Sequence, residues 1–207
     1  NAYDGELLYQ DAQLGRVLDA VRAHGGGAQW PRTAVVVTSD HGEGLGQHGE
    51  AAHGSTWFEQ LHAPLAMRIP GEPARRERAL LTSSDILPTL LGRLGPGAFD
   101  DYRSAALGRD ALADAETADA VLSQDTGRTR DVPFKYSLTH GGFRYFRIEH
   151  DDGRVEERLY DLGVDPFELR DVAAQFGEVV ADMRARTLAR IDAESARGRA
   201  LRGADAS

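Results

Sequence analysis

A chain of 207 residues with a formal net charge of −9 is unsuited to nucleic acid or an anionic membrane surface as its main partner. The sequence has no cysteine, which excludes disulfides, thiolate metal ligands and a cysteine nucleophile within this chain. Its 41% hydrophobic and 28% charged residues are typical of a globular protein with a sizeable core. An anionic substrate stays compatible with this charge, because a local metal can invert the field inside one cleft.

The first part of the sequence alternates between helical and strand-like patterns. Residues 2–24 carry apolar residues at helical spacing and predict a helix that ends at consecutive glycines. The run Ala34–Val37 is β-branched and predicts a strand buried on both faces. Trp57–Leu61 predicts a short helix, and Ala63–Ile69 predicts a second strand. Thr82–Leu94 predicts another helix. Its expected buried stripe consists of Leu87, Leu90, Leu91 and Leu94.

The pattern in the second part is that of short antiparallel strands. Val121–Gln124 predicts one strand, and three more strand-like runs cover Phe134–Thr139, Phe143–Glu149 and Val155–Tyr160. Gly-Gly and Asp-Asp-Gly sequences separate these three runs and suit tight hairpin turns, so we expect an antiparallel meander. A final helix is expected from about Phe167 to the region of residue 196.

The stretch with the richest chemistry follows the first predicted strand directly. Asp40 and His41 stand side by side just past its end, where open α/β sheets place their ligands. A carboxylate next to an imidazole is a metal-binding pair, and a further histidine on this loop, His53, could act on a substrate. We expect His48 to orient the glycine-rich loop and Glu43 to support the metal pair.

The segment Ser39-Asp-His-Gly-Glu-Gly-Leu-Gly-Gln-His-Gly resembles the second signature of the sulfatase family, which belongs to the alkaline-phosphatase-like superfamily. The resemblance extends along nearly the whole chain, because further family-like segments stand in the right order around the signature. They are the helix from Tyr3 to Gly15, His62-Ala-Pro-Leu-Ala-Met-Arg-Ile-Pro-Gly, Asp85-Ile-Leu-Pro-Thr-Leu-Leu, and Leu159-Tyr-Asp-Leu with Asp165-Pro-Phe-Glu-Leu.

The resemblance implies an α/β fold, the C-terminal part of an alkaline-phosphatase-like α/β/α sandwich. Residues 1–130 are assigned to this sandwich, and residues 131–207 to a small antiparallel sheet with a C-terminal helix. The chain then resembles the C-terminal half of a sulfatase, and its sheet is completed by the N-terminal half or by self-association. In the family the N-terminal half carries a formylglycine nucleophile. It is made from the cysteine or serine of a C/S-x-P-S-R motif, which this sequence lacks.

Residue by residue, the resemblance assigns Asp40 and His41 to the pair that ligates a divalent metal from the later half of the sequence. The metal is calcium by family expectation, with manganese or magnesium as alternatives. His53 matches a position held by lysine or, in some members, by histidine, which contacts the sulfate or protonates the leaving oxygen. Two ligands cannot close a coordination sphere, so the isolated chain is expected to bind metal weakly and to be inactive.

The function implied by the resemblance is metal-dependent hydrolysis of sulfate esters, with an anionic small molecule or glycan sulfate ester as substrate. Phosphodiesterases and phosphonate monoester hydrolases of the superfamily share the Asp-His pair, and the superfamily also contains phospho-group transferases. The alternative outside enzymes is a catalytically inactive module that binds anionic glycans or a partner protein. The family expectation for localisation is periplasmic or extracellular, including a membrane tether through upstream segments.

Overall fold

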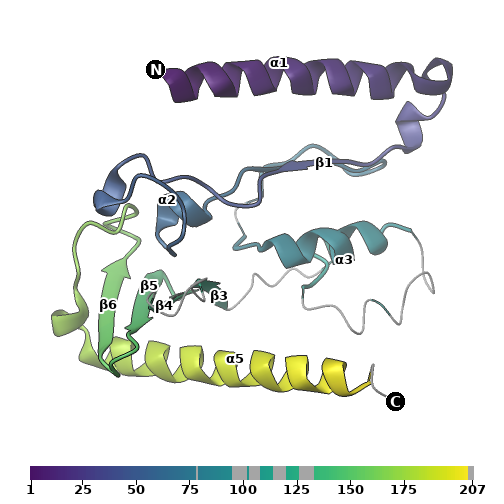
Figure 1. The fold of residues 1–207 in the computed structure, drawn as a ribbon. Helices are drawn as coiled ribbons and strands as arrows, with labels where there is room; N and C mark the ends of the chain where they lie inside the picture. The colour runs from purple at the N-terminus through teal and green to yellow at the C-terminus, as the bar shows by residue number, and fades with distance from the viewer. Residues whose placement is uncertain (78, 95–101, 103–107, 114–119, 126–132, 205–207) are drawn as a thin grey trace. The chain divides into compact units, whose positions relative to one another are not determined.

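The computed structural model describes residues 1–77, 79–94, 102, 108–113, 120–125 and 133–204, and these fall into two compact units. The first unit comprises residues 1–38 and 65–76, and the second comprises residues 39–64 and 77–207. Figure 1 shows the chain coloured from its N-terminus to its C-terminus and labels most of its helices and strands. The predicted division after residue 130 falls within 126–132, outside the described residues, and stays a prediction. Among the helices of the described residues, none is both long enough and apolar enough to cross a membrane.

The first unit consists of one long helix and a two-stranded sheet. Helix α1 (Ala2–Ala23) is capped by Asn1, whose side chain accepts the Asp4 N–H at 2.9 Å. Strand β1 (Val35–Thr38) pairs antiparallel with β2 (Leu65–Arg68), which confirms both predicted strands, the first shifted by one residue and the second shorter. The prediction that the first strand is buried on both faces was wrong, since its valines are only partly buried. A strand is buried on both faces only where another layer covers each side of its sheet. Within the described residues of this unit, that sheet consists of β1 and β2 alone.

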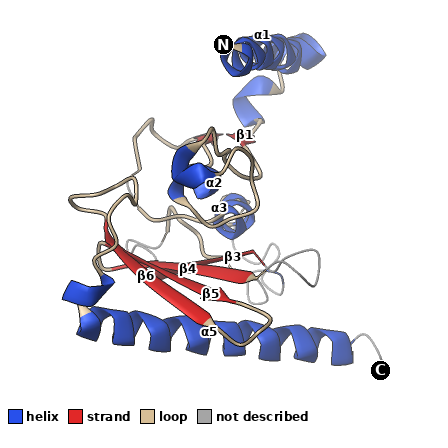
Figure 2. Cartoon of the chain, turned by 60° about the vertical axis from the view of Figure 1, so that its left-hand side comes forward, coloured by secondary structure: helices blue, strands red, loops and turns tan. Residues whose placement is uncertain are grey.

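Four antiparallel strands in the order β3-β4-β5-β6 form the sheet of the second unit (Figure 2). They are β3 (Ala120–Asp125), β4 (Phe134–His140), β5 (Phe143–Glu149) and β6 (Val155–Asp161). The predicted meander is therefore confirmed. The Gly141-Gly142 turn joins β4 to β5 with φ angles of 57° and 83°, and a two-residue hairpin turn of this kind requires positive φ at both positions.

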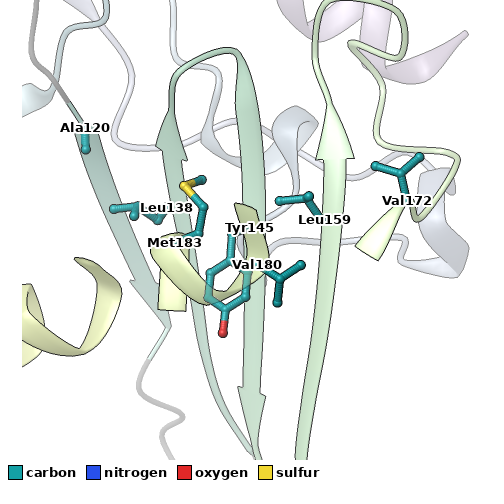
Figure 3. Packing of buried hydrophobic residues seen from close by; sticks show 7 residues of the cluster. All are labelled: Ala120, Leu138, Tyr145, Leu159, Val172, Val180 and Met183. Atoms are coloured by element: carbon teal, nitrogen blue, oxygen red, sulfur yellow. The ribbon is translucent and has the colours of Figure 1, made fainter. Parts of the chain in front are cut away.

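Alternation along the strands gives this sheet two apolar faces with different partners. One face packs on helix α5 (Gly177–Ala204) through the cluster drawn in Figure 3. Its members are Ala120, Leu138, Tyr145, Leu159, Val172, Val180 and Met183. The other face carries Phe146 and Tyr160, which pack on Trp57, the residue before helix α2 (Phe58–Leu61). The β-sheet therefore lies between the C-terminal helix and the segment that holds the sulfatase-like signature.

The helix predicted over Thr82–Leu94 is shorter in the structure. A 3-10 turn at Ser83–Asp85 leads into helix α3 (Ile86–Leu91). This tighter first turn forms because the Asp85 carboxylate accepts the N–H of Thr82 at 2.8 Å in a capping box.

The face of α3 that is buried also differs from the prediction. Leu87 and Leu94 are 43% and 62% exposed, so they do not belong to a buried stripe. Thr89 is buried in their place, because its hydroxyl donates to the Asp85 carbonyl oxygen at 2.6 Å and accepts the Ala111 N–H at 2.9 Å. Satisfied hydrogen bonds let a polar side chain occupy a position that hydrophobic periodicity assigns to leucine.

The C-terminal helix begins later than the predicted start at about Phe167. Helix α5 starts at Gly177, and a separate 3-10 turn precedes it. Two aspartates hold the intervening segment out of the helix by accepting backbone N–H groups. Asp165 accepts from Arg170 at 2.8 Å, and Asp171 accepts from two further residues. Such side-chain bonds compete with helix formation.

Candidate active site

Asp40 and His41 present two metal-ligand atoms close together. Asp40 Oδ2 and His41 Nε2 lie 3.6 Å apart. His41 Nδ1 lies 2.6 Å from the Gly42 carbonyl oxygen, so Nδ1 carries the proton and Nε2 keeps its lone pair. The side chain of Asp40 is 87% exposed, and its other oxygen accepts the His41 N–H at 3.0 Å. A carboxylate oxygen and an imidazole nitrogen are thus both available as neighbouring ligands.

This donor pair fits part of a divalent metal site. Across the described residues, no group of three or more histidine, aspartate or glutamate side chains is arranged to hold a metal. A hard ion such as calcium takes about six to eight ligands, and the pair supplies two of them. The chemistry of the two donors therefore fits a divalent metal, and the pair alone supplies two ligands.

His53 lies directly against this pair. Its ring centroid is 4.2 Å from that of His41, with the two rings tilted by 36°. His53 Nδ1 lies 3.3 Å from Glu43 Oε2, so Nε2 is the other nitrogen of the ring. The other Glu43 oxygen, Oε1, is buried and has no hydrogen-bond partner among the described residues. A buried acceptor without a partner is uncommon in folded proteins, and its place beside His53 is compatible with a ligand there.

Close backbone approach explains the glycines of the signature. The N–H groups of Gly42 and Gly44 donate to the carbonyl oxygens of Gln60 and Ala52 at 2.9 and 3.3 Å. A Cβ at Gly42 would stand 2.0 Å from the Glu59 carbonyl oxygen, and a Cβ at Gly44 would stand 2.7 Å from that of Ala52. Only glycine fits at either position, and it lets the loop return tightly beside its own first residues.

The returning segment is fixed by a buried polar cluster around Gln60, which is 2% exposed. Its side chain accepts the Ser55 N–H and donates to Glu50, both at 2.8 Å. The Trp57 indole N–H donates to the second Glu50 oxygen at 3.3 Å, and Lys135 of β4 lies 3.7 Å from that carboxylate. These bonds attach the segment that follows His53 to the sheet.

His48 has hydrogen-bond acceptors at both ring nitrogens. Nδ1 lies 2.9 Å from the Glu59 carboxylate, and Nε2 lies 3.0 Å from the Glu168 carbonyl oxygen. Its ring stacks on Trp57 with 4.0 Å between centroids. Two acceptors are both satisfied only when each ring nitrogen carries a proton, so these contacts favour the imidazolium form. Burial lowers the pKa of His48, but the hydrogen bonds and charges of Glu59 and Glu168 together raise it above the usual value.

The raised pKa predicts that His48 contributes to a pH dependence of stability. Because the folded pKa exceeds the unfolded value of about 6.5, the contribution is complete below about pH 6.5 and is lost as the pH rises through the folded pKa. In a His48→Asn variant we expect stability to fall less as the pH rises, because asparagine does not titrate. Asparagine is chosen because it also tolerates the positive φ of 52° at this position. Urea unfolding at several pH values measures it, with the exposed His24→Asn variant as control. Parallel stability curves for wild type and His48→Asn would contradict the prediction.

Among the predicted site residues, the structure brings Asp40, His41 and His53 together in one place. Glu43 contacts His53 instead of the Asp-His pair, and His48 contacts residues that anchor the loop. The metal-binding and catalytic roles of these side chains stay predictions.

No role was predicted from the sequence for two residues that contact this segment or each other, Arg144 and Glu168. The Glu168 side chain is 0% exposed, and its Oε1 lies 3.0 Å from the Arg144 Nε. Its Oε2 accepts the Phe58 N–H at 2.9 Å. Burial raises the pKa of the Glu168 carboxyl, against the opposing effect of the Arg144 charge. The Asp165-Pro-Phe-Glu segment is the sequence signal that contains Glu168, but it does not indicate these partners.

Comparison with known proteins gives a consistent result. Residues 1–96 match the family model described as Sulfatase. Arylsulfatase K of Mus musculus is 30% identical over 179 residues, covering 82% of this chain and 31% of the relative. A sulfatase of Formosa agariphila is 30% identical over 200 residues, covering 94% of this chain and 37% of the relative. The chain thus spans about a third of the length of the curated relatives that it matches.

Solved structures show the same fold. A putative sulfatase from Bacteroides fragilis superposes with a TM-score of 0.74 at 20% identity, over 88% of this chain and 40% of that structure. A protein in complex with its substrate D-glucosamine-2-N, 6-O-disulfate superposes with a TM-score of 0.61 at 20% identity, over 89% of this chain and 38% of that structure. The expected α/β class, with a small antiparallel sheet and a C-terminal helix, is confirmed.

Proposed function

Because residues 1–96 match the Sulfatase family model and curated sulfatases are 30% identical to this chain, we propose that it is a sulfatase-family chain and forms part of the active site of an enzyme that hydrolyses sulfate esters with a divalent metal. The observation that carries the proposal is the meeting of Asp40, His41 and His53 on one loop. We further propose that an N-terminal portion of the protein supplies the remaining metal ligands and the formylglycine nucleophile. The fraction of the relatives that the chain spans supports this division.

In this proposal Asp40 Oδ2 and His41 Nε2 hold the metal, for which calcium, manganese and magnesium are the candidates. When bound, the metal supplies a Lewis acid that neutralises the negative charge of the sulfate group. The Gly42 carbonyl oxygen keeps His41 in the tautomer that leaves Nε2 unprotonated. The chain itself thus keeps His41 Nε2 available as a metal ligand without help from a bound ion.

His53 acts as the proton donor of the reaction. Hydrolysis breaks the bond between sulfur and the bridging oxygen, and the departing alcohol oxygen needs a proton. Glu43 holds Nδ1 of His53, so the proton is delivered from Nε2. The ring contact with His41 places this proton donor beside the metal-binding pair.

We propose an aryl sulfate or a sulfated saccharide as the substrate. A curated relative is named as an arylsulfatase, and a structural neighbour holds a glucosamine disulfate as its substrate. Both substrates present the same group, a sulfate on a bridging atom. The chain as a whole has a negative net charge, which repels an anionic sulfate group. Recognition of the sulfate is therefore proposed to depend on the metal held by Asp40 and His41.

The test is a hydrolysis assay of the full-length protein with an aryl sulfate and an aryl phosphate diester side by side, with calcium or manganese supplied. Wild type is compared with Asp40→Ala and His53→Ala. We expect cleavage of the sulfate by wild type and a loss of about 100- to 10,000-fold in kcat for His53→Ala, the usual contribution of a general acid. His24→Ala, which changes an exposed histidine outside the loop, should match wild type.

The outcomes separate the candidate functions. Cleavage of the diester alone assigns the same site to a phosphodiesterase. Full activity in His53→Ala rejects its role as proton donor. No cleavage of either compound, while the protein binds a sulfated glycan, favours an inactive binding module.

A further inference from the structure

One residue contacts both ends of the loop that carries His53. We call residues 48–58 the His53 loop. At its first residue, His48 Nε2 donates to the Glu168 carbonyl oxygen at 3.0 Å. At its last residue, the Phe58 N–H donates to the Glu168 carboxylate at 2.9 Å. The backbone and the side chain of Glu168 therefore each hold one end of the loop, although Glu168 lies far along the chain.

The backbone conformation at this contact is unusual in both partners. Within the described residues, His48 and Glu168 are the two non-glycine residues with positive φ, at 52° and 58°. Residues other than glycine, asparagine and aspartate seldom adopt this conformation, and it persists where surrounding contacts determine it. These two uncommon positions are hydrogen-bonded to each other. The fold accepts local strain on both sides to make this contact.

Glu168 is itself held by the sheet. Its side chain is 0% exposed and pairs with Arg144 of β5, whose own side chain is 10% exposed. The contact with Glu168 is an ion pair, and the Arg144 Nε–H donates its hydrogen bond to the Thr139 hydroxyl of β4 at 3.1 Å. Two central strands therefore fix the carboxylate that holds Phe58. A rigid base of this kind can transmit position to the loop.

We propose that Glu168 is a positioning residue that holds both ends of the His53 loop, and so sets the place of His53 relative to Asp40 and His41. This inference rests on the proposed function, in which His53 donates the proton. It gives the C-terminal Asp165-Pro-Phe-Glu segment a task in catalysis without contact to substrate. Residue 168 lies beyond residues 1–96, the part that matches the family model.

The test needs variants that keep the protein folded. Glu168→Ala removes the carboxylate but leaves the Arg144 charge buried and unpaired, which threatens folding. The double variant Arg144→Met/Glu168→Leu removes both charges together and leaves the Phe58 N–H without its acceptor. Glu178→Ala, at an exposed position in the first turn of α5, is the matched control.

Two readouts are taken on the full-length protein. Hydrogen exchange compares peptides from the His53 loop with peptides from β4 and β5. In the double variant we expect exchange in the loop to be about five- to tenfold faster, with exchange in the strands unchanged, because one hydrogen bond of the loop is lost. Steady-state kinetics with the aryl sulfate should show kcat reduced by about 100-fold and KM nearly unchanged, the expected result of a misplaced catalytic group.

The outcomes are distinct. Unchanged exchange in the His53 loop, or equal acceleration in the loop and in β4 and β5, overturns the inference. Faster exchange with full kcat in an active enzyme overturns the positioning role, because the contact is then only structural. If wild type cleaves no sulfate ester, the proposed function fails, and the exchange data alone decide whether Glu168 holds the loop.

Discussion

Replacing Arg144 with methionine should lower the free energy of unfolding by about 3–5 kcal/mol, the usual result of leaving one partner of a buried ion pair behind. The side chains of Arg144 and Glu168 are 10% and 0% exposed, and Arg144 Nε lies 3.0 Å from Glu168 Oε1. Methionine fills much of the space of the arginine stem but cannot compensate the Glu168 charge. The carboxylate would then be buried with the Phe58 N–H as its remaining donor.

The pH dependence of this loss identifies its cause. Burial already raises the pKa of Glu168, and removing the Arg144 charge should raise it further. The destabilisation should therefore be greatest above that pKa and shrink as the pH falls through it, because a protonated carboxyl is less costly to bury. Chemical denaturation of Arg144→Met across pH measures this, with Arg144→Met/Glu168→Leu expected to recover most of the stability. A loss that is independent of pH, or equal in the double variant, would point to packing instead of charge.

Replacing Gly42 with alanine should weaken metal binding by about 10- to 100-fold, with a matching loss of hydrolysis, as changes that misorient metal ligands do. The added Cβ would stand 2.0 Å from the Glu59 carbonyl oxygen, so the backbone at this point must move. Gly42 follows His41 directly, and its carbonyl oxygen holds His41 Nδ1. Movement here therefore displaces Asp40 and His41, the proposed metal ligands.

Calorimetric titration of the full-length protein with calcium and with manganese measures this effect, together with the aryl sulfate assay. Gly177→Ala serves as control, because a Cβ there meets no atom within 4 Å. Wild-type affinity in Gly42→Ala would show that the loop absorbs the methyl group without moving His41. Unfolding temperatures of both variants separate a local shift from general loss of structure.

The sequence predicted the second-unit sheet well because its signals are local. Alternation within β4, β5 and β6 and the turn dipeptides between them involve neighbouring residues. The start of α5 was predicted too early because Asp165 and Asp171 use their side chains to bond backbone N–H groups, an effect that hydrophobic spacing does not report. The leucine stripe of α3 failed for the same kind of reason, since Thr89 is buried with satisfied hydrogen bonds.

The candidate site was predictable as far as it lies on one loop. Asp40, His41 and His53 are close in sequence, and a family-like motif contains them. The contacts of Glu168 with His48 and Phe58 span 120 and 110 residues, and no periodic pattern connects positions so far apart. The positive φ at His48 and Glu168 is equally invisible, because local preference favours glycine or asparagine there. Distant contacts override such preferences only once the fold has formed.

The hairpin at Gly141-Gly142 restricts how this region can change length during evolution. Adjacent residues of β5, Tyr145 and Phe146, belong to the two opposite apolar faces of the sheet. An insertion or deletion of one residue that shifted β5 in register would exchange these faces and turn Arg144 away from Glu168. The helix-side core and the anchor of the His53 loop would be lost in the same event. Homologous sequences that vary in this turn should therefore do so in ways that preserve strand register.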